Sequence, residues 1–398
     1  MKAERESLVE RLQPLEAELV EIRREIHRHP EIGFEEARTA RLVADKLRGW
    51  GLEVEEGVAR TGVVATLRGA RPGNGAVGLR ADLDALNIQE VAGRDHGSTV
   101  SGKMHACGHD GHTAMLLGAA RYLSENKDFA GTVRFIFQPA EEGLAGARVM
   151  LEEGLFDRFP VDSVYGMHNM PGMAVGTFAT RKGPFMAAGD SWTATFTGSG
   201  GHGGGGAHLS TDPTLAAAQF VLAIQTIVSR NVPAVETAVV SVGHLRGGEF
   251  GAPNIIPNEV IVRGTARSYK PEIRDLLERR LAEIAAACAA VYGCEGKLDY
   301  HRRYPPLINH AAETDVAASA ARALVGEAAV TTQTEPRMFS EDFSFLLQAR
   351  PGAFIFIGNG VGPNGEAAHL HTSDYDFNDA ILTLGASYWV SLVQETLG

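Results

Sequence analysis

Residues 112–137 read HTAMLLGAARYLSENKDFAGTVRFIF and contain the two patterns that decide the fold. A helical pattern covers His112–Leu123, and an apolar run typical of a buried strand follows at Val133–Phe137. Similar apolar runs lie on both sides of this pair, at 62–67, 76–79 and 164–167. Strands that alternate with helices in this way predict an α/β fold, with a mostly parallel sheet and helices on both of its faces.

A different order of elements occupies the middle of the chain. From about Asp190 to His301 the patterns read strand, helix, strand, strand, helix, strand. This βαββαβ order is that of a ferredoxin-like α+β domain. We therefore predict a discontinuous main domain made of residues 1–186 and 302–398, interrupted by an inserted small domain at 187–301.

Composition excludes several classes of partner. The 398 residues carry 37 basic and 49 acidic side chains, a net charge of −12, which argues against binding to nucleic acid or to an anionic membrane. No segment is long and apolar enough to predict a membrane span. Three cysteines, an odd number, predict no disulfide framework and fit a reducing compartment, so we expect a cytoplasmic protein.

The octapeptide His105-Ala106-Cys107-Gly108-His109-Asp110-Gly111-His112 carries the strongest chemical signal. It places a thiol, three imidazoles and a carboxylate in one short stretch. Thiolate and imidazole suit Zn²⁺ and related cations, whereas a turn needs only one or two such residues. The octapeptide therefore predicts part of a metal site.

Further acids and histidines follow the predicted strands. In a parallel sheet the carboxyl ends of the strands lie at the same edge, where binding and catalytic residues are usually found. Glu141 and Glu142 follow the predicted strand at Val133–Phe137. Of these two neighbouring carboxylates, one could bind metal while the other serves as a general base toward water. With the octapeptide, these side chains supply donors for two metals that share a thiolate or carboxylate; the candidates are Cys107, His109, Glu141, Glu142, His168 and His371.

Several motifs together resemble the M20 metallopeptidase and amidohydrolase family, in particular its aminoacylase and hippurate-hydrolase branch. Besides the octapeptide, the resemblance rests on LRADLDAL at 79–86, QPAEEG at 138–143, GMH at 166–168, GGHG at 200–203, NIIP at 254–257, GTAR at 264–267, SEDF at 340–343 and YDFND at 375–379. These motifs keep the family's order over nearly the whole chain.

The resemblance implies a role for each motif. It makes Cys107, His109, Glu142, His168 and His371 the ligands of two divalent metal ions (Mn²⁺, Zn²⁺, Co²⁺ or Ni²⁺), with the Cys107 thiolate as a candidate bridge. Glu141 would be the general base and proton shuttle. Asp82, Asp110 and His112 would orient imidazoles through their free ring nitrogens. The inserted domain would be a lid and dimerisation domain, in which His202 stabilises an oxyanion and Asn254 and Arg267 grip the carboxylate of the substrate.

The resulting hypothesis is a metal-dependent amidohydrolase that cleaves hippurate-like or N-acetyl amino acids, acting as a homodimer or higher homo-oligomer. Related activities are the alternative: a metallo-carboxypeptidase or dipeptidase, or an acyl-diaminopimelate deacetylase. Two other classes stay open. Cys107 could be a nucleophile with His109 or His168 as its base, or the chain could be a metal-dependent binding protein without catalysis.

Overall fold

The computed structural model describes residues 7–361 and 365–398. The predicted main domain therefore includes residues 1–6 and 362–364, which lie outside the described residues. The chain divides into two compact units. Unit 1 comprises Met1–Phe185, Ile308–Glu335 and Asp342–Gly398, and unit 2 comprises Met186–Leu307 and Pro336–Glu341. Each unit is described below by itself.

An eight-stranded sheet forms the centre of unit 1, in the order β1-β2-β4-β3-β5-β16-β6-β15. The four central strands β4, β3, β5 and β16 run parallel, and antiparallel pairs occur toward the two edges. Their near-continuous apolar runs are buried on both faces, as parallel sheets covered by helices require. The strands are β1 Glu53–Val58, β2 Gly62–Arg68, β3 Arg71–Asp82, β4 Ala130–Gln138, β5 Ser163–Pro171, β6 Phe178–Ala179, β15 Val330–Thr331 and β16 Gly352–Gly360.

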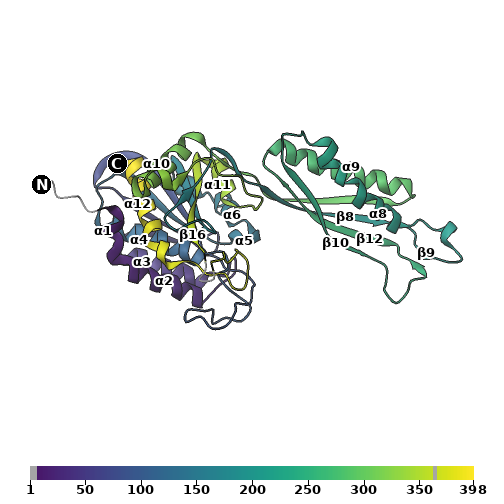
Figure 1. Cartoon of the computed structure of the whole chain (residues 1–398), viewed down its shortest axis with the longest axis horizontal. Coiled ribbons are helices and arrows are strands. Elements are labelled where there is room, and N and C mark those ends of the chain that lie inside the picture. Colours follow the sequence, from purple (N-terminus) through teal and green to yellow (C-terminus); the bar gives the residue numbers. More distant parts are fainter. Residues whose placement is uncertain (1–6, 362–364) are drawn as a thin grey trace. The chain divides into compact units, whose positions relative to one another are not determined.

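Helices cover this sheet and confirm the α/β prediction. Figure 1 shows α2, α3, α4 and α12 grouped together, and α4 packs directly against α12. At that contact, a Cβ on Gly118 would lie 2.9 Å from Cβ of Ala386, so the small residue permits the close approach. The helices are α1 Leu8–Leu12, α2 Glu16–Arg28, α3 Ala37–Gly49, α4 His109–Glu125, α5 Glu141–Leu144, α6 Gly146–Glu152, α7 Leu155–Arg158, α10 Ala311–Val325, α11 Phe343–Ala349 and α12 Leu382–Leu397.

Unit 2 contains a four-stranded antiparallel sheet in the order β10-β12-β8-β13, with two helices packed on it. Along the chain the elements follow the ferredoxin-like βαββαβ order that the sequence predicts. They are β8 Ala188–Thr197, α8 Pro213–Ala223, β10 Ala238–Gly247, β12 Glu259–Ser268, α9 Pro271–Val291 and β13 Glu295–Tyr304. Trp192 and Phe196 of β8 pack with Phe220 of α8 in the core of this unit.

Short elements complete the two units. The two-residue strands β9 (Gly201–His202) and β11 (Ile255–Ile256) pair with each other in unit 2. Strands β7 (Gly183–Met186) and β14 (Leu307–Asn309) lie where the chain passes from one unit to the other. Single helical turns cover 13–15, 207–209, 227–231, 327–329 and 379–381. Within the described ranges, no helix combines the length and the apolar character needed to cross a membrane.

Candidate active site

The octapeptide forms the turn that begins α4. Cys107 is buried directly before the turn, and Gly108 adopts φ +97°. A Cβ on Gly108 would lie 2.3 Å from Oδ1 of Asn169, so both the conformation and the space require glycine. His109 is the first residue of α4, and His112 follows one turn later on the same face of the helix.

Two histidines from distant segments converge on the thiol of Cys107. The Nε2 atoms of His168, on β5, and of His371 each lie 3.3 Å from Sγ of Cys107. Nδ1 of His168 donates to the carbonyl oxygen of Asn169 at 2.7 Å, which leaves Nε2 as the coordinating nitrogen. The backbone N–H of His371, in the left-handed region at φ +63°, donates to the carbonyl of Ala106 at 2.8 Å. This bond fastens the His371 segment to the octapeptide.

The two neighbouring carboxylates leave β4 through an irregular turn and take different surroundings. Ala140 has φ +56° and Gly143 has φ +84°. Oε1 of Glu142 lies 3.0 Å from Nε2 of His371, and its backbone N–H donates to Asp84. Glu141 is buried, and its Oε1 accepts the backbone N–H of Asp342 at 3.3 Å. The carboxylate of Glu142 therefore lies beside His371, whereas that of Glu141 accepts a hydrogen bond from the backbone of Asp342.

The structure identifies Asp84 as the residue that orients His109, a role the sequence did not assign to it. Nδ1 of His109 lies 3.2 Å from Oδ1 of Asp84. Nε2 of His109 is buried and has no hydrogen-bond partner within the described residues. Oδ2 of Asp82 lies 3.7 Å from this nitrogen, beyond hydrogen-bond distance. A buried imidazole nitrogen without a hydrogen bond, beside a thiol and several carboxylates, fits a ligand of a cation. The repeated acid in LRADLDAL is the signal that could have indicated Asp84.

Of the three residues expected to orient imidazoles, Asp82 and Asp110 do bind imidazole rings, but these belong to His112 and His27 and not to predicted ligands. Asp82 accepts from Nδ1 of His112 at 2.6 Å and pairs with Arg80 at 2.8 Å. The other ring nitrogen of His112 lies 2.8 Å from Oδ1 of Asn169, so this pair supports β5 and the start of α4. Asp110 points away from the ligand cluster: it lies 2.9 Å from Nε of Arg23 and 2.8 Å from Nδ1 of His27, both on α2. None of the three forms a hydrogen bond that orients His109 or His168.

The five predicted ligands form two overlapping groups of donor atoms. Cys107 with His109 and His168 makes one group, and Cys107 with Glu142 and His371 makes the other; within each, the donor atoms lie within 4.8 Å of one another. The thiol belongs to both groups. Burial raises the pKa of Cys107, and the carboxylates of Glu142, Glu141 and Asp82 raise it further. This concentration of negative groups could hold two divalent cations that share the thiolate.

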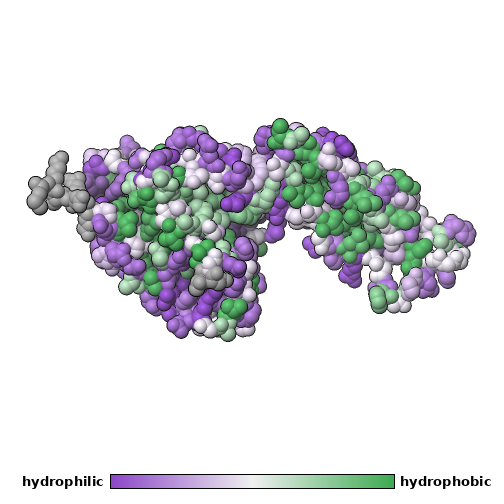
Figure 2. Space-filling view, viewed as in Figure 1, coloured by the Kyte–Doolittle hydropathy of each residue, from purple (hydrophilic) through white to green (hydrophobic). Residues whose placement is uncertain are grey.

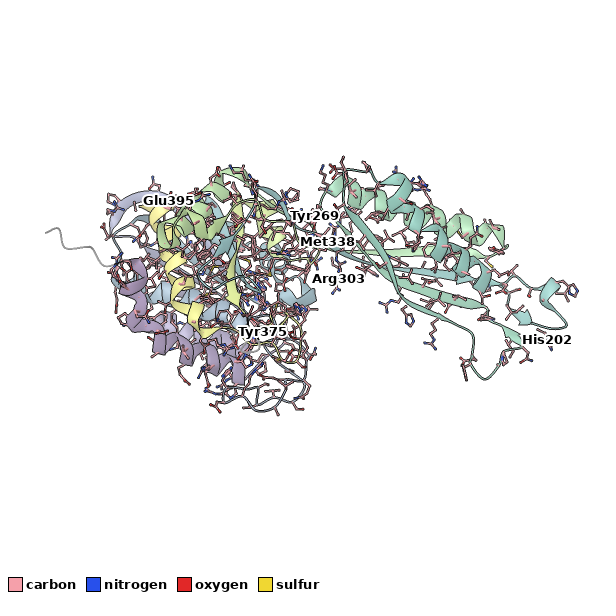
Figure 3. The ribbon with its side chains drawn as sticks, in the orientation of Figure 1. His202, Tyr269, Arg303, Met338, Tyr375 and Glu395 are labelled. Carbon is pink, nitrogen blue, oxygen red and sulfur yellow. The ribbon has the colours of Figure 1, made fainter. Side chains whose placement is uncertain are left out.

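The remaining predicted residues lie in unit 2, at opposite ends of its sheet. His202 pairs in register with Ile255, and Gly203 N–H donates to the carbonyl of Asn254 at 2.8 Å, so His202 and Asn254 are neighbours. Arg267 lies near the end of β12, eight residues after Glu259. At about 3.3 Å per residue, this length is about 26 Å. Figure 3 shows His202 and Tyr269, which is two residues beyond Arg267, at opposite ends of this unit.

Arg267 is half-buried and partly engaged within its own unit. Its Nη1 donates to the carbonyls of Asp190 and Ala266, at 3.3 and 3.0 Å, and to the hydroxyl of Thr265. His202 is exposed, and its Nδ1 accepts the backbone N–H groups of Gly204 and Gly205 at 3.1 and 3.0 Å. These bonds leave Nε2 of His202 as the nitrogen directed to other partners.

Comparison with known proteins matches this chain to one family over most of its length. The family model described as peptidase family M20/M25/M40 matches residues 78–395. A hippurate hydrolase of Campylobacter jejuni is 40% identical, with 98% of this chain and 100% of that protein covered. A protein of Saccharolobus solfataricus named thermostable carboxypeptidase 1 is 38% identical, with 96% of each covered. Among solved structures, the YXEP protein of Bacillus subtilis, a dinuclear metal-binding peptidase, has a TM-score of 0.82 and 32% identity over 96% of this chain and 98% of that one.

Proposed function

This chain belongs to peptidase family M20/M25/M40, and from that premise we propose that it hydrolyses the amide bond of N-acyl amino acids, releasing a carboxylic acid and a free amino acid. One observation carries the proposal. Two groups of metal-ligand atoms share the thiol of Cys107, and neither contains Glu141, whose carboxylate lies beside them, within 4.8 Å of donor atoms of His109 and Glu142. The similarity to a hippurate hydrolase over the full length supports the same substrate class.

Cys107, His109 and His168 would hold one divalent cation, and Cys107, Glu142 and His371 the other; Mn²⁺, Zn²⁺, Co²⁺ and Ni²⁺ all accept such mixed donors. When bound, the cations would lower the pKa of a water molecule and polarise the carbonyl of the substrate. Glu141 takes the proton of the attacking water and delivers it to the leaving amine. The N–H of Asp342 holds the carboxylate of Glu141 in place for this transfer.

The same surroundings argue against Cys107 as a nucleophile. A nucleophilic cysteine needs a lowered pKa, usually from a neighbouring cation. Here burial and three carboxylates raise the pKa of Cys107 instead. A nucleophile mechanism also gives no role to Glu142 and His371, which lie against the thiol.

We propose further that two copies of the chain complete each active site. Arg267 lies about 26 Å along β12 from Glu259, and His202 lies at the Glu259 end of this unit, so one small substrate cannot contact both from a single copy. A homodimer formed through unit 2 would let one copy supply Arg267 and the other His202 with Asn254. Leu215 and Leu222 of α8 are 50% and 74% exposed, and Figure 2 shows hydrophobic residues at the surface of this region, which offers an apolar face for such pairing.

A carboxypeptidase activity is the second candidate, favoured by the similarity to thermostable carboxypeptidase 1. A peptide whose last bond is cleaved is also an N-acylated amino acid, so the same machinery would serve a longer acyl group.

The free cysteines in the structure are consistent with the proposed cytoplasmic location.

The test is a hydrolysis screen of apo protein reloaded separately with Mn²⁺, Zn²⁺, Co²⁺ or Ni²⁺, against hippurate, N-acetyl amino acids and short peptides. We expect turnover of N-acyl amino acids, and Glu141→Gln should lose about 10²- to 10⁴-fold in kcat while it retains its metal. Metal analysis of both proteins is the control. Full activity of Glu141→Gln would overturn the assignment of the base, and no turnover with any combination would favour a metal-dependent binding protein.

A further inference from the structure

Glu36 is a fully buried carboxylate to which the proposed reaction gives no task. It is the residue before α3 and has no exposed surface. Its two oxygens have different partners: Oε1 accepts the backbone N–H of Ala140 at 2.8 Å, and Oε2 accepts the hydroxyl of Thr61 at 2.6 Å. Burying a carboxylate costs free energy unless hydrogen bonds compensate for the lost water. The groups that Glu36 contacts therefore indicate why it is buried.

The contact with Ala140 links Glu36 to the turn that separates the two active-site carboxylates. Ala140 directly precedes Glu141 and is held at φ +56°, a left-handed conformation that is unfavourable for a residue with a Cβ. Three of the hydrogen bonds that hold the turn are those of Ala140 N–H with Glu36, of Ala140 C=O with the N–H of Gly146 at 3.0 Å, and of Glu142 N–H with Asp84 at 2.9 Å. Only the first of these depends on a side chain outside the active site.

Packing shows independently that the segment before α3 is fitted to this turn. A Cβ on Gly33 would lie 3.0 Å from both Cα and Cβ of Ala140, closer than side chains normally approach. Ala140 itself is fully buried, so without Glu36 its N–H would lose its acceptor in a place that water does not reach. The peptide plane between Pro139 and Ala140 would then lose this hydrogen bond, and with it one of the restraints on the backbone that leads to Glu141.

We propose that Glu36 is a positioning residue for the general base: by fixing the peptide N–H of Ala140, it sets the direction in which Glu141 leaves the turn. This inference rests on the proposed function. Glu36 touches neither the predicted ligands nor the substrate, so its loss should affect the proton transfer and leave substrate binding and metal binding unchanged. The length of the side chain matters for this role, and its charge does not.

Three variants separate these properties. Glu36→Gln keeps the length and an oxygen that can accept from Ala140, whereas Glu36→Asp keeps the charge and withdraws the oxygen by one methylene. Burial raises the pKa of Glu36 to about 7, so a neutral amide resembles the protonated form of the native side chain. Glu31→Ala is the matched control, because the carboxylate of Glu31 also accepts backbone N–H groups, those of Arg38 and Thr39 in α3, without touching the turn.

The experiment measures kcat, KM, bound metal and thermal unfolding for each holoenzyme with hippurate. We expect Glu36→Asp and Glu36→Ala to lower kcat by about 10- to 100-fold at a KM within about twofold of the wild type, because a misplaced catalytic group can cost that much. Glu36→Gln should retain most of kcat, and Glu31→Ala should lower stability alone.

A wild-type kcat in Glu36→Asp would overturn the inference, as would an equal fall of kcat in Glu31→Ala or a loss of metal in step with activity. If Glu36→Ala fails to fold, the contrast between Asp and Gln still decides. Absence of turnover in the wild type would instead refute the proposed function, so the two failures are distinguishable.

Discussion

Complementation between two inactive variants tests whether two copies share one active site. His202→Ala removes the proposed oxyanion donor, which typically costs about 10²- to 10³-fold. Arg267→Ala removes a charge-assisted contact to the substrate carboxylate, a loss of about 1.5–3 kcal/mol or about 10- to 100-fold. Each homodimer should therefore be nearly inactive at substrate concentrations below KM.

The geometry of unit 2 determines the activity expected of a hybrid dimer, which contains one copy of each variant. Arg267 lies about 26 Å along β12 from Glu259, and His202 lies at the Glu259 end of the unit, whereas a substrate the length of two residues spans about 7 Å. If both side chains act on one substrate, as proposed, they come from different copies. In a hybrid of the two variants, one site receives both native residues and the other receives neither, whichever residue acts within its own copy.

The assay co-expresses the two variants with different affinity tags, purifies the hybrid by both tags in turn, and measures kcat/KM with hippurate. A symmetric dimer with one intact site of two should recover about half of the wild-type value. Hybrid activity no higher than that of the single variants would refute the shared site, and so would failure to capture any hybrid. A parallel hybrid of Glu141→Gln with His202→Ala shows which residue crosses between copies.

Three further predictions concern the candidate metal ligands and the buried hydrogen bonds of His27 with Asp110 and Glu90. Asp84→Asn should lower metal affinity about 10- to 100-fold, because it weakens the bond that orients His109; unchanged affinity in a metal titration would contradict this. Chelation should lower the thermal midpoint of the wild type, since cations that bind only the folded state stabilise it; identical apo and metal-loaded melting curves would contradict it. Burial would lower the pKa of His27, but its bonds to Asp110 and Glu90 outweigh burial and raise it to about 9. Because this folded-state pKa exceeds the unfolded value of about 6.5, its stabilisation, up to about 3 kcal/mol, is complete below about pH 6.5 and lost as pH rises to about 9. His27→Gln should remove that slope, which denaturant unfolding of both proteins at about pH 6 and about pH 9 measures; equal slopes would contradict the assignment.

The sequence predicted the layered sheet and the convergence of its side chains because both follow from short-range patterns. The apolar runs stop at or shortly before Asp82, Glu142 and His168, which lie at the end of β3, just after β4 and within the C-terminal half of β5. Parallel strands bring such positions together. The βαββαβ order of unit 2 was visible for the same reason.

Details that depend on which side chains meet across the fold were not predictable. Asp82 and Asp84 are two residues apart, so both remain candidates until the position of α4 decides that Asp84 meets His109. Asp110 stands among metal-binding residues in the sequence, but its partners are on α2, more than eighty residues earlier. No local pattern relates Glu36 to Ala140, because that contact exists only after two distant segments pack.

The bond between His371 and the octapeptide also determines when the centre can form. His371 and Cys107 are 264 residues apart, and all of unit 2 lies in the sequence between them. A nascent chain therefore exposes Cys107 and His109 long before the ribosome has made the last ligand. During that interval a cation can be held by only part of its ligand set, so complete loading must follow synthesis, and the unfinished cluster is exposed to oxidants and competing metals in the cell.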